Sequence, residues 1–278
     1  MIDPSQALAA EYSERAVAYA TYWAPVIHPM ASPLLSAMRL ADARRVLDIG
    51  TGTGALWPLI QRAAPRAQFW GVDRAHGMLR AGGEAVRGRV AVMDAEHLGF
   101  REAVFDRALL VFVLFHVPDP AGALREVRAA LHERGSVGVA VWGADPGLPG
   151  ASIWAEELDR AHAPSDPRDP RVMQHALMDT TAKLTWLLEQ AGLNPTDVWS
   201  RWFVHEWTGE RLIATQTHCG LPSRRLRGLP RDARQACTER VRARLSALTA
   251  GDLAYEVEVI YGVARRPAQP GLDPLQGA

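Results

Sequence analysis

The stretch Arg45-Val-Leu-Asp48-Ile-Gly50-Thr-Gly52-Thr-Gly54 decides the fold of this chain. An apolar, β-rich run carries an acid near its end, and three glycines follow at every second position. The residues from Ala55 to Arg62 then have a helical pattern. A glycine turn between a strand and a helix lets the backbone approach a ligand closely, because glycine has no Cβ, and the helix N-terminus offers unpaired N–H groups. Asp48 suits a cationic amine better than a phosphate.

The composition is that of an ordinary globular protein of 278 residues with no net charge. A neutral chain has no electrostatic footprint for nucleic acid or an anionic membrane, so we expect neither as a partner. Two cysteines and nine histidines without zinc spacing argue against a disulfide framework and a metal site. The N-terminus does not resemble a signal peptide, and the longest apolar run, 108–115, is far shorter than the about 20 residues of a membrane span. We therefore expect a soluble, cytoplasmic protein.

Strands and helices alternate along the first half of the chain. We expect strands at 45–49, 68–72, 90–93, 107–113 and 136–142, with helices at 55–64, 75–86 and 121–132 between them. This alternation predicts an α/β fold, a doubly wound and mostly parallel sheet with helices on both faces. Before it, an apolar stripe predicts one helix over 5–23 that is broken by Pro25, His28 and Pro29, and a short helix follows at 32–41.

The pattern changes after Trp142. Two loop-forming stretches, 143–150 and 164–170, flank a helical segment. The remaining elements that we expect are helices at 152–162, 180–191 and 232–248 and strands at 198–207 and 254–263, with 210–219 left ambiguous. The last two strands fit an antiparallel closing hairpin.

The glycine loop alone is compatible with two classes of enzyme. Gly50-x-Gly52-x-x-Ala55 also fits the dinucleotide fingerprint, with Asp73 at the right distance for a ribose. Three features disfavour a nicotinamide enzyme. Asp48 stands where a dinucleotide fold usually has an apolar residue, Asp94-Ala95 places an acid where an adenine amine could be bound, and the chain closes with a hairpin.

Taken together, the motifs resemble a class I S-adenosylmethionine-dependent methyltransferase of the small-molecule group, similar to the type 11 and ubiquinone/menaquinone enzymes. Val46–Gly54 matches the first motif of that family, Gly71–Asp73 the second and Met93–Glu96 the third. Phe105-Asp106 and the run from Val113 to Pro120 match the fourth block. The resemblance covers roughly residues 43–142. It implies a Rossmann-like, seven-stranded sheet with an antiparallel C-terminal strand and a helical lid.

The resemblance implies S-adenosylmethionine as the cofactor and assigns contacts to it. Asp48 would bind the methionine ammonium, Asp73 the ribose hydroxyls and Asp94 the adenine amine. The other implied cofactor-binding residues are Gly50, Thr51, Gly52, Gly54, Arg74, Met78, Ala95, Val111 and Phe112. The family often has two histidines in the fourth block. Here Phe115 replaces the first, so only His116 remains, and any acid–base role of the first is lost.

The candidate catalytic residues are Tyr19 and His116. Tyr19 shares the N-terminal stripe with Tyr12, which resembles a family pattern that lays a tyrosine over the cofactor, although a plain apolar helix face also explains it. His116 follows the fourth strand, where such folds bind ligands, although a packed or capping histidine explains it as well. His162 and His175 are weaker candidates. The arginines of 224–244 fit a solvated helix face or a site for an anionic substrate.

We interpret the chain as five segments. These are an N-terminal helical lid at 1–42, the cofactor-binding half at 43–142, a lid or substrate insertion at 143–180, a C-terminal half completing the sheet at 181–266 and a disordered tail at 267–278. The expected function is transfer of a methyl group to O, N or C of a small, partly apolar metabolite in secondary metabolism, leaving S-adenosylhomocysteine. The alternatives are a nicotinamide-dependent oxidoreductase and a non-catalytic S-adenosylmethionine-binding protein. The oligomeric state is open, a homo-oligomer included.

Overall fold

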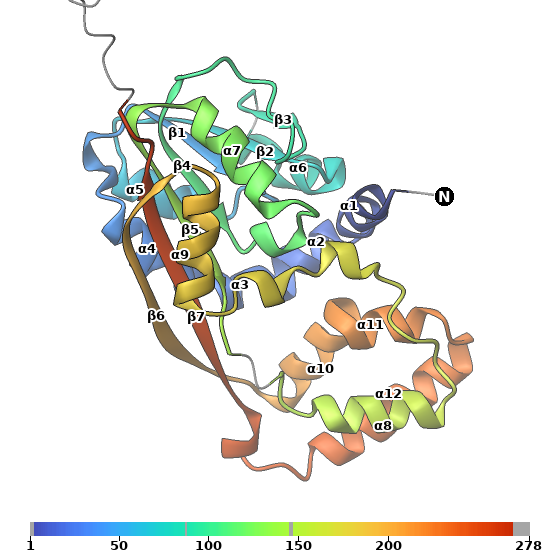
Figure 1. Cartoon of the computed structure of the whole chain (residues 1–278). Helices are drawn as coiled ribbons and strands as arrows, with labels where there is room; N and C mark the ends of the chain where they lie inside the picture. Colours follow the sequence, from blue (N-terminus) through green and yellow to red (C-terminus); the bar gives the residue numbers. More distant parts are fainter. Residues whose placement is uncertain (1–2, 87, 145–146, 269–278) are drawn as a thin grey trace, which may run out of the picture.

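A single seven-stranded sheet forms the centre of the computed structural model, which describes residues 3–86, 88–144 and 147–268. Its strands are β1 Arg45–Ile49, β2 Gln68–Asp73, β3 Val90–Val92, β4 Phe105–Val111, β5 Leu131–Trp142, β6 Asn194–Glu206 and β7 Ala254–Arg265. Their order is β3-β2-β1-β4-β5-β7-β6. The first five strands pair in parallel, and β7 runs antiparallel to both β5 and β6 (Figure 1). The predicted fold class is confirmed.

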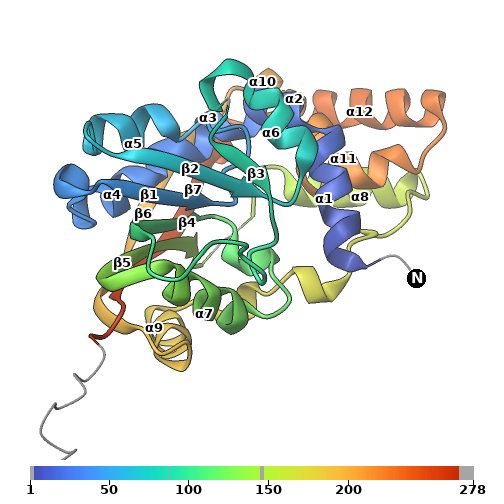
Figure 2. The same cartoon turned by 90° about the horizontal axis from the view of Figure 1, so that it is seen from above.

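Helices cover both faces of the sheet (Figure 2). One face carries α4 Ser32–Ala37 and α5 Trp57–Ala63, and the opposite face carries α7 Pro120–Ala130 and α9 Thr181–Gln190. The central strands β1 and β5 are buried almost throughout, because helices cover them on both sides. This explains why the sequence of β1 is a continuous apolar run rather than an alternating one.

Some predicted boundaries are wrong. The strand expected at 107–113 is β4 at Phe105–Val111, because Phe112 takes a left-handed backbone conformation (φ 57°) that ends it. The helix expected to reach 132 ends at Ala130, where β5 begins directly. The helix expected at 75–86 is α6 His76–Gly82 followed by the 3₁₀ turn η4 Gly83–Val86. The other short 3₁₀ turns are η3 Leu40–Asp42, η5 Leu114–His116, η6 Pro170–Val172, η7 His175–Leu177 and η8 Gly251–Leu253.

The N-terminal segment is not the single helix that its stripe predicts. It divides into α1 Pro4–Glu14, α2 Ala16–Ala18, the π-helical η1 Tyr19–Trp23, α3 Ala24–Ile27 and η2 His28–Ala31. Arg15 leaves helical geometry between α1 and α2, with its N–H donated to the Tyr12 carbonyl. Pro25 and Pro29 do not stop the chain from continuing in helical turns, because each lies in the first turn of a new segment, where no N–H is needed.

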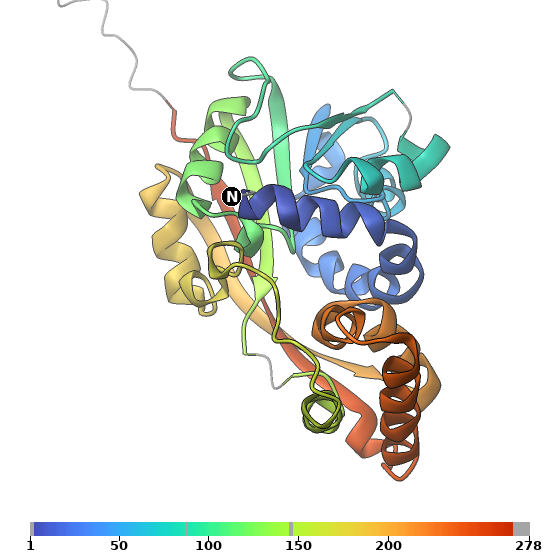
Figure 3. The same cartoon turned by 90° about the vertical axis from the view of Figure 1, so that its right-hand side faces the viewer.

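A helical lobe lies beside the sheet (Figure 1). It contains α8 Ala151–Arg160, α10 Gly209–His218, α11 Gly220–Arg227 and α12 Arg231–Leu245. The ambiguous stretch 210–219 is therefore helical, and α11 is a helix that the sequence pattern did not predict. Figure 3 shows α1, in dark blue, lying across the molecule between the sheet and this lobe. The tail predicted to be disordered lies mostly outside the described residues.

Candidate functional site

The glycine loop between β1 and α5 is built on backbone that favours glycine. Gly50, Gly52 and Gly54 have φ values of 70°, 58° and 71°. A Cβ on Gly50 would also lie 2.5 Å from Val113 Cγ2, at the end of the neighbouring strand β4. The backbone N–H groups of Gly50 and Thr51 donate to the Val72 carbonyl at 2.8 and 3.0 Å, which ties the loop to β2.

Asp48 does not line the cavity above this loop. Its carboxylate is almost fully buried and accepts hydrogen bonds from Thr51 Oγ1 at 2.7 Å and Trp57 Nε1 at 3.1 Å. Burial raises the pKa of this carboxyl to about 6. The geometry places Asp48 as a support for the loop, and its expected contact with a methionine ammonium stays a prediction.

Asp73 lies at the end of β2 and borders the cavity. One carboxylate oxygen accepts from the Gly52 N–H and the other from the Ala75 N–H, both at 2.8 Å. Each oxygen has a second lone pair, so the carboxylate can still accept hydrogen bonds from two ligand hydroxyls. The acid therefore joins the glycine loop to the start of α6 and lines the cavity.

Asp94, after β3, belongs to a small charged group at the rim. Arg74 forms a close ion pair with its Oδ2 and lies 3.9 Å from Glu96 Oε2. The Glu96 N–H donates to Asp94 Oδ1 at 3.1 Å. Arg74 and Glu96 also line the cavity, so a ligand amine bound by Asp94 would share that carboxylate with Arg74.

Most of the predicted site residues surround one cavity of about 1070 Å³, counted to its open mouth. Those that line it are Tyr19, Gly50, Thr51, Gly52, Asp73, Arg74, Met78, Asp94, Ala95, Val111, Phe112 and His116. Asp48 and Gly54 do not. Phe112, with its left-handed backbone, stacks on Trp142 with ring centroids 4.2 Å apart. Strained backbone of this kind is common at functional sites.

The first helix closes one side of this cavity. Ser5, Leu8, Ala9 and Tyr12 of α1 line it, and α1 packs directly on α6. Gly77 allows this contact, because a Cβ there would lie 2.4 Å from the Ser13 carbonyl oxygen. The Gly77 N–H donates to Ser13 Oγ at 3.1 Å. The helix α1 is thus packed against the first turn of α6.

Tyr12 and His116 both line the cavity and form a hydrogen-bonded pair. Tyr12 Oη lies 3.0 Å from His116 Nε2, and His116 Nδ1 lies 3.2 Å from the Val172 carbonyl. A carbonyl only accepts, so Nδ1 carries the proton, and Nε2 accepts from the Tyr12 hydroxyl. Burial lowers the pKa of His116 to about 3 and raises that of Tyr12 to about 12. Both groups are neutral near pH 7.

A second cavity adjoins the first and shares Leu8, Tyr12, Tyr19 and His116 with it. Its apolar walls are aromatic and come from distant parts of the chain: Trp23, Phe115, Trp142 and Tyr255. Leu148, Arg168 and His175 bring the predicted insertion 143–180 into this cavity. None of the described residues of that insertion lines the first one. His162 lines neither cavity.

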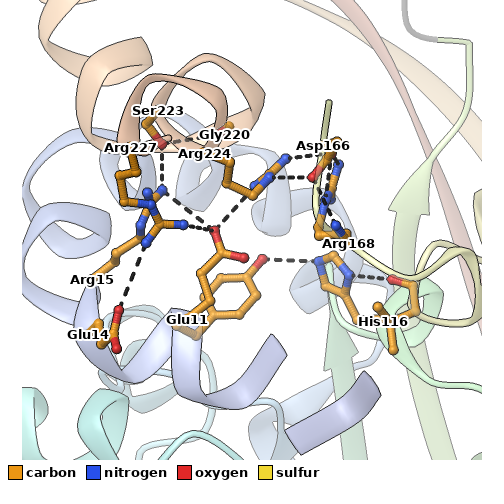
Figure 4. A network of polar contacts seen from close by, with 12 residues as sticks. Glu11, Glu14, Arg15, His116, Asp166, Arg168, Gly220, Ser223, Arg224 and Arg227 are labelled. Carbon is orange, nitrogen blue, oxygen red and sulfur yellow. Dashed lines mark hydrogen bonds and ion pairs between the residues drawn. The ribbon is translucent and has the colours of Figure 1, made fainter. Parts of the chain in front are cut away.

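An ion-pair network includes several residues that line the second cavity (Figure 4). Glu11 of α1 lies 3.5 Å from Arg224 and 3.4 Å from Arg227, both on α11. Asp166 accepts from Arg168 at 2.8 Å and from Arg224 at 3.0 Å. These contacts hold α1, α11 and the loop before η6 together.

The sequence pattern missed several lining residues. Arg168 and Arg224 lie 56 positions apart and meet only through Asp166. His28 also lines the first cavity, where burial lowers its pKa to about 4. The motif Met93–Glu96 includes Glu96 but does not indicate that its side chain lines the cavity. The arginine-rich segment was the one sequence signal for a charged site, and it did not indicate which arginines face a cavity.

Residues 47–139 match the family model described as a methyltransferase domain. The chain carries a class I S-adenosylmethionine-dependent methyltransferase domain. The match spans the strands, the glycine loop and the acids that line the first cavity. The methyltransferase domain therefore contains most of the cavity-lining positions that the motifs predicted.

Curated methyltransferases match part of the chain. The chain is 36% identical over 106 residues to malonyl-[acyl-carrier protein] O-methyltransferase of Geobacter sulfurreducens, covering 37% of this chain and 40% of that protein. It is 31% identical over 116 residues to aklanonic acid methyltransferase DauC of a Streptomyces species, covering 39% and 53%. The match to demethylmenaquinone methyltransferase of Thermotoga maritima is 34% identical and covers 34% and 42%. The chain thus spans about half the length of these relatives or less.

Solved structures share the fold. A Bacillus halodurans structure aligns with a TM-score of 0.56 at 15% identity, covering 85% of this chain and 98% of that one. The [4+2]-cyclase SpnF aligns with a TM-score of 0.54 at 20% identity, covering 89% and 84%. At these identities the likeness shows the fold alone, and a cyclase among the matches illustrates that this fold does not fix a reaction.

Two features are absent from the described residues, a membrane-spanning helix and a cluster of metal ligands. No helix in that part of the chain is long and apolar enough to cross a membrane. Within the same residues, no group of three or more His, Cys, Asp or Glu side chains could hold a metal ion.

Proposed function

We propose that this protein transfers the methyl group of S-adenosylmethionine to a small, partly apolar metabolite and releases S-adenosylhomocysteine. One observation carries the proposal. The cavity built by the methyltransferase motifs opens onto a second, aromatic-walled cavity, and Tyr12, Tyr19 and His116 lie at the junction. A cofactor in the first cavity and an acceptor in the second would meet at these side chains.

The residues of the first cavity suit the cofactor chemically. Asp73 retains lone pairs for two ribose hydroxyls, and Asp94 with the Ala95 backbone lies where an adenine would be held. The glycine loop leaves space for the methionine end beside Val111 and Phe112. Met78 supplies an apolar contact for the adenosine.

When bound, the cofactor supplies an electrophilic methyl group on a sulfonium. The task of this chain is to align the acceptor atom and to keep water out. Orientation of this kind can contribute up to ~7–11 kcal/mol of barrier reduction. α1 and the aromatic walls enclose the junction, which serves both purposes.

Tyr19 and His116 remain our candidate catalytic residues, and the geometry adds Tyr12. His116 is neutral near pH 7 but a weak base, because its pKa is about 3. Its Nε2 already accepts from Tyr12, so an acceptor proton would reach the imidazole only through the tyrosine hydroxyl or after that hydroxyl turns away. An acceptor that arrives already deprotonated needs no such base.

The names of the relatives specify acceptors of different kinds. They are a malonyl group on an acyl-carrier protein, aklanonic acid and demethylmenaquinone. We extend from them to a role in secondary metabolism for this chain.

Titration calorimetry tests the cofactor. Wild-type protein should bind S-adenosylhomocysteine but not NAD. Asp73→Ala should weaken the binding of S-adenosylhomocysteine by about 1–3 kcal/mol, because it removes the charged carboxylate that accepts hydrogen bonds from the ligand. Asp179→Ala, on an exposed surface pair with Lys183, is the matched control. Tighter binding of NAD would favour the oxidoreductase.

Turnover tests the reaction. Release of S-adenosylhomocysteine from S-adenosylmethionine, measured against a panel of aromatic acceptors, should require acceptor and protein together. Cofactor binding without turnover on any acceptor would favour a non-catalytic binding protein.

A further inference from the structure

The lining of the second cavity carries an excess of positive charge. Three guanidinium groups line it, those of Arg15, Arg168 and Arg224. Glu11 is the one carboxylate among the described residues that line it. Asp166 lies behind and holds Arg168 and Arg224 next to each other. The three lining arginines face two carboxylates, Glu11 and Asp166, so positive charge remains for a further anion.

The hydrogen bonds of these arginines leave donors for that anion. Arg168 binds Asp166 through its backbone N–H, Nε and Nη2, and its Nη1 makes no hydrogen bond within the described residues. The side chain of Arg224 is only 9% exposed, so its charge is not screened by bulk water. Arginine presents its donors in a planar fork that matches carboxylate and phosphate oxygens.

The field of this cluster reaches the junction of the two cavities. Burial dominates the pKa shifts of Tyr12 and His116, and the charges of Arg168 and Arg224 lower the pKa of both groups. The second cavity also has several aromatic side chains in its walls. Trp23, Phe115 and Trp142 form its walls, and Phe115 stacks on His175 at 4.1 Å. The cavity thus has both aromatic and cationic side chains in its lining.

We propose that the methyl acceptor carries an oxyanion, a carboxylate or a phosphate, on an aromatic body, and that Arg168 and Arg224 bind this oxyanion while the rings of the second cavity hold the body. The proposal rests on the proposed function and specifies its substrate class. Figure 4 shows Arg168 and Arg224 both directed at Asp166.

Binding of matched probes tests this. The probes are 2-naphthoate, 2-naphthyl phosphate, neutral methyl 2-naphthoate and cationic 2-naphthylmethylammonium, titrated into protein saturated with S-adenosylhomocysteine. At least one of the two acids should bind about tenfold more tightly than the ester or the cation, as for a hydrogen-bonded charge pair. The acid that binds more tightly tells whether the oxyanion is a carboxylate or a phosphate.

Three variants locate the site. Arg168→Gln and Arg224→Gln should each weaken binding of the preferred acid by about tenfold and bring it near the affinity of the ester. Arg227→Gln is the matched control, because Arg227 also contacts Glu11 but does not line the cavity. It should change the acid affinity by less than about threefold. Circular dichroism and cofactor affinity should stay as in wild type in all three.

The outcomes separate the two proposals. Any one of four outcomes would overturn this inference, even with cofactor binding intact. They are equal binding of acid and ester, tighter binding of the cation, no binding of either acid, and unchanged acid affinity in both Arg168→Gln and Arg224→Gln. Failure of wild type to bind the cofactor would instead count against the proposed function. In that case the probe series on cofactor-free protein still decides whether the arginines bind an oxyanion.

Discussion

Asp48 is the residue whose role the structure changes most. The motif places it beside a cationic ligand, yet its carboxylate accepts from Thr51 and Trp57 and does not line the cavity. Burial without a cation raises its pKa from 3.8 to about 6. Its proton is therefore bound more tightly in the folded chain than in the unfolded one.

We predict that Asp48→Asn alters the pH dependence of stability. As pH rises from 3.8 to about 6, the unfolded chain loses this proton before the folded chain does, so the free energy of unfolding of the wild type falls. The free energy of unfolding of the asparagine variant does not fall in this way. Relative to wild type it should therefore rise by at most about 3 kcal/mol across that window. Urea unfolding of both proteins at the two ends of the window measures it. Parallel pH curves would contradict the assignment.

Tyr12 and His116 make a second prediction at the residue scale. If this pair takes part in methyl transfer, Tyr12→Phe and His116→Asn should each lower kcat by about 10²-fold or more with little change in cofactor affinity. The double variant should lose little beyond either single one, because the residues act as a unit. Tyr19→Phe provides the comparison for the rival candidate.

The pH profile is the independent readout for this pair. Because burial holds the pKa of His116 at about 3, kcat/KM of wild type should show no histidine titration near 6.5. If Tyr12→Phe and His116→Asn both retained full rates, transfer would depend on orientation alone or on Tyr19.

At the scale of elements, the contact between α1 and α6 seats the N-terminal segment over the cofactor cavity. Gly77 is required by close approach rather than by its φ angle, since a Cβ there would overlap the Ser13 backbone. The 143–180 insertion instead contributes to the second cavity. Its predicted role as a lid that orders on ligand binding remains a prediction.

We predict that Gly77→Ala displaces α1. Overpacking of this kind typically costs ~1–3 kcal/mol, here against docking of the helix. Hydrogen exchange over residues 4–14 should speed up, and the affinity for S-adenosylhomocysteine should fall. Gly209→Ala is the control, because a Cβ there meets nothing within 4 Å. If hydrogen exchange over residues 4–14 were as slow in Gly77→Ala as in wild type, α1 would tolerate the added Cβ without being displaced.

At the scale of the whole molecule, the arginines of α11 and α12 connect the lobe internally and to the N-terminal helix. Glu157 of α8, 1% exposed, accepts from Arg240 at 2.7 Å and from Arg244 at 3.1 Å. The Arg240 hydrogen bond is the main cause of the lowered pKa of Glu157. The neutral total charge of the chain hides these pairings, because acids on α8 and α1 balance arginines far along the sequence.

We predict that Glu157→Gln destabilises the lobe. It removes the buried counter-charge shared by Arg160, Arg240 and Arg244, of which Arg244 keeps its ion pair with Glu156. This should lower the free energy of unfolding by about 1–3 kcal/mol. Glu210→Gln removes the partner of Arg242, an ion pair whose side chains are both exposed, and should cost no more than about 1 kcal/mol. Thermal unfolding of the two variants decides, and equal losses would mean that burial of Glu157 carries no extra stability.

The sequence by itself determined the sheet, the glycine loop and the positions of three acids at or near the carboxyl ends of three strands. These features are local. A continuous apolar run needs burial on both faces, glycine is favoured where φ is positive, and the carboxyl ends of parallel strands meet at one edge. Asp73 and Asp94 could therefore be placed at the same cavity without knowing how any helix packs.

Only the tertiary structure decided which distant side chains meet. Tyr12 and His116 are 104 residues apart, and Arg224 reaches an acid 58 residues away. Local periodicity shows that a helix has a buried face but not which element covers it, so neither pair could be predicted. The same reason explains Asp48. A strand-end acid can be turned toward the ligand or toward the following helix, and here the indole of Trp57 and the hydroxyl of Thr51 hold it on the helix side.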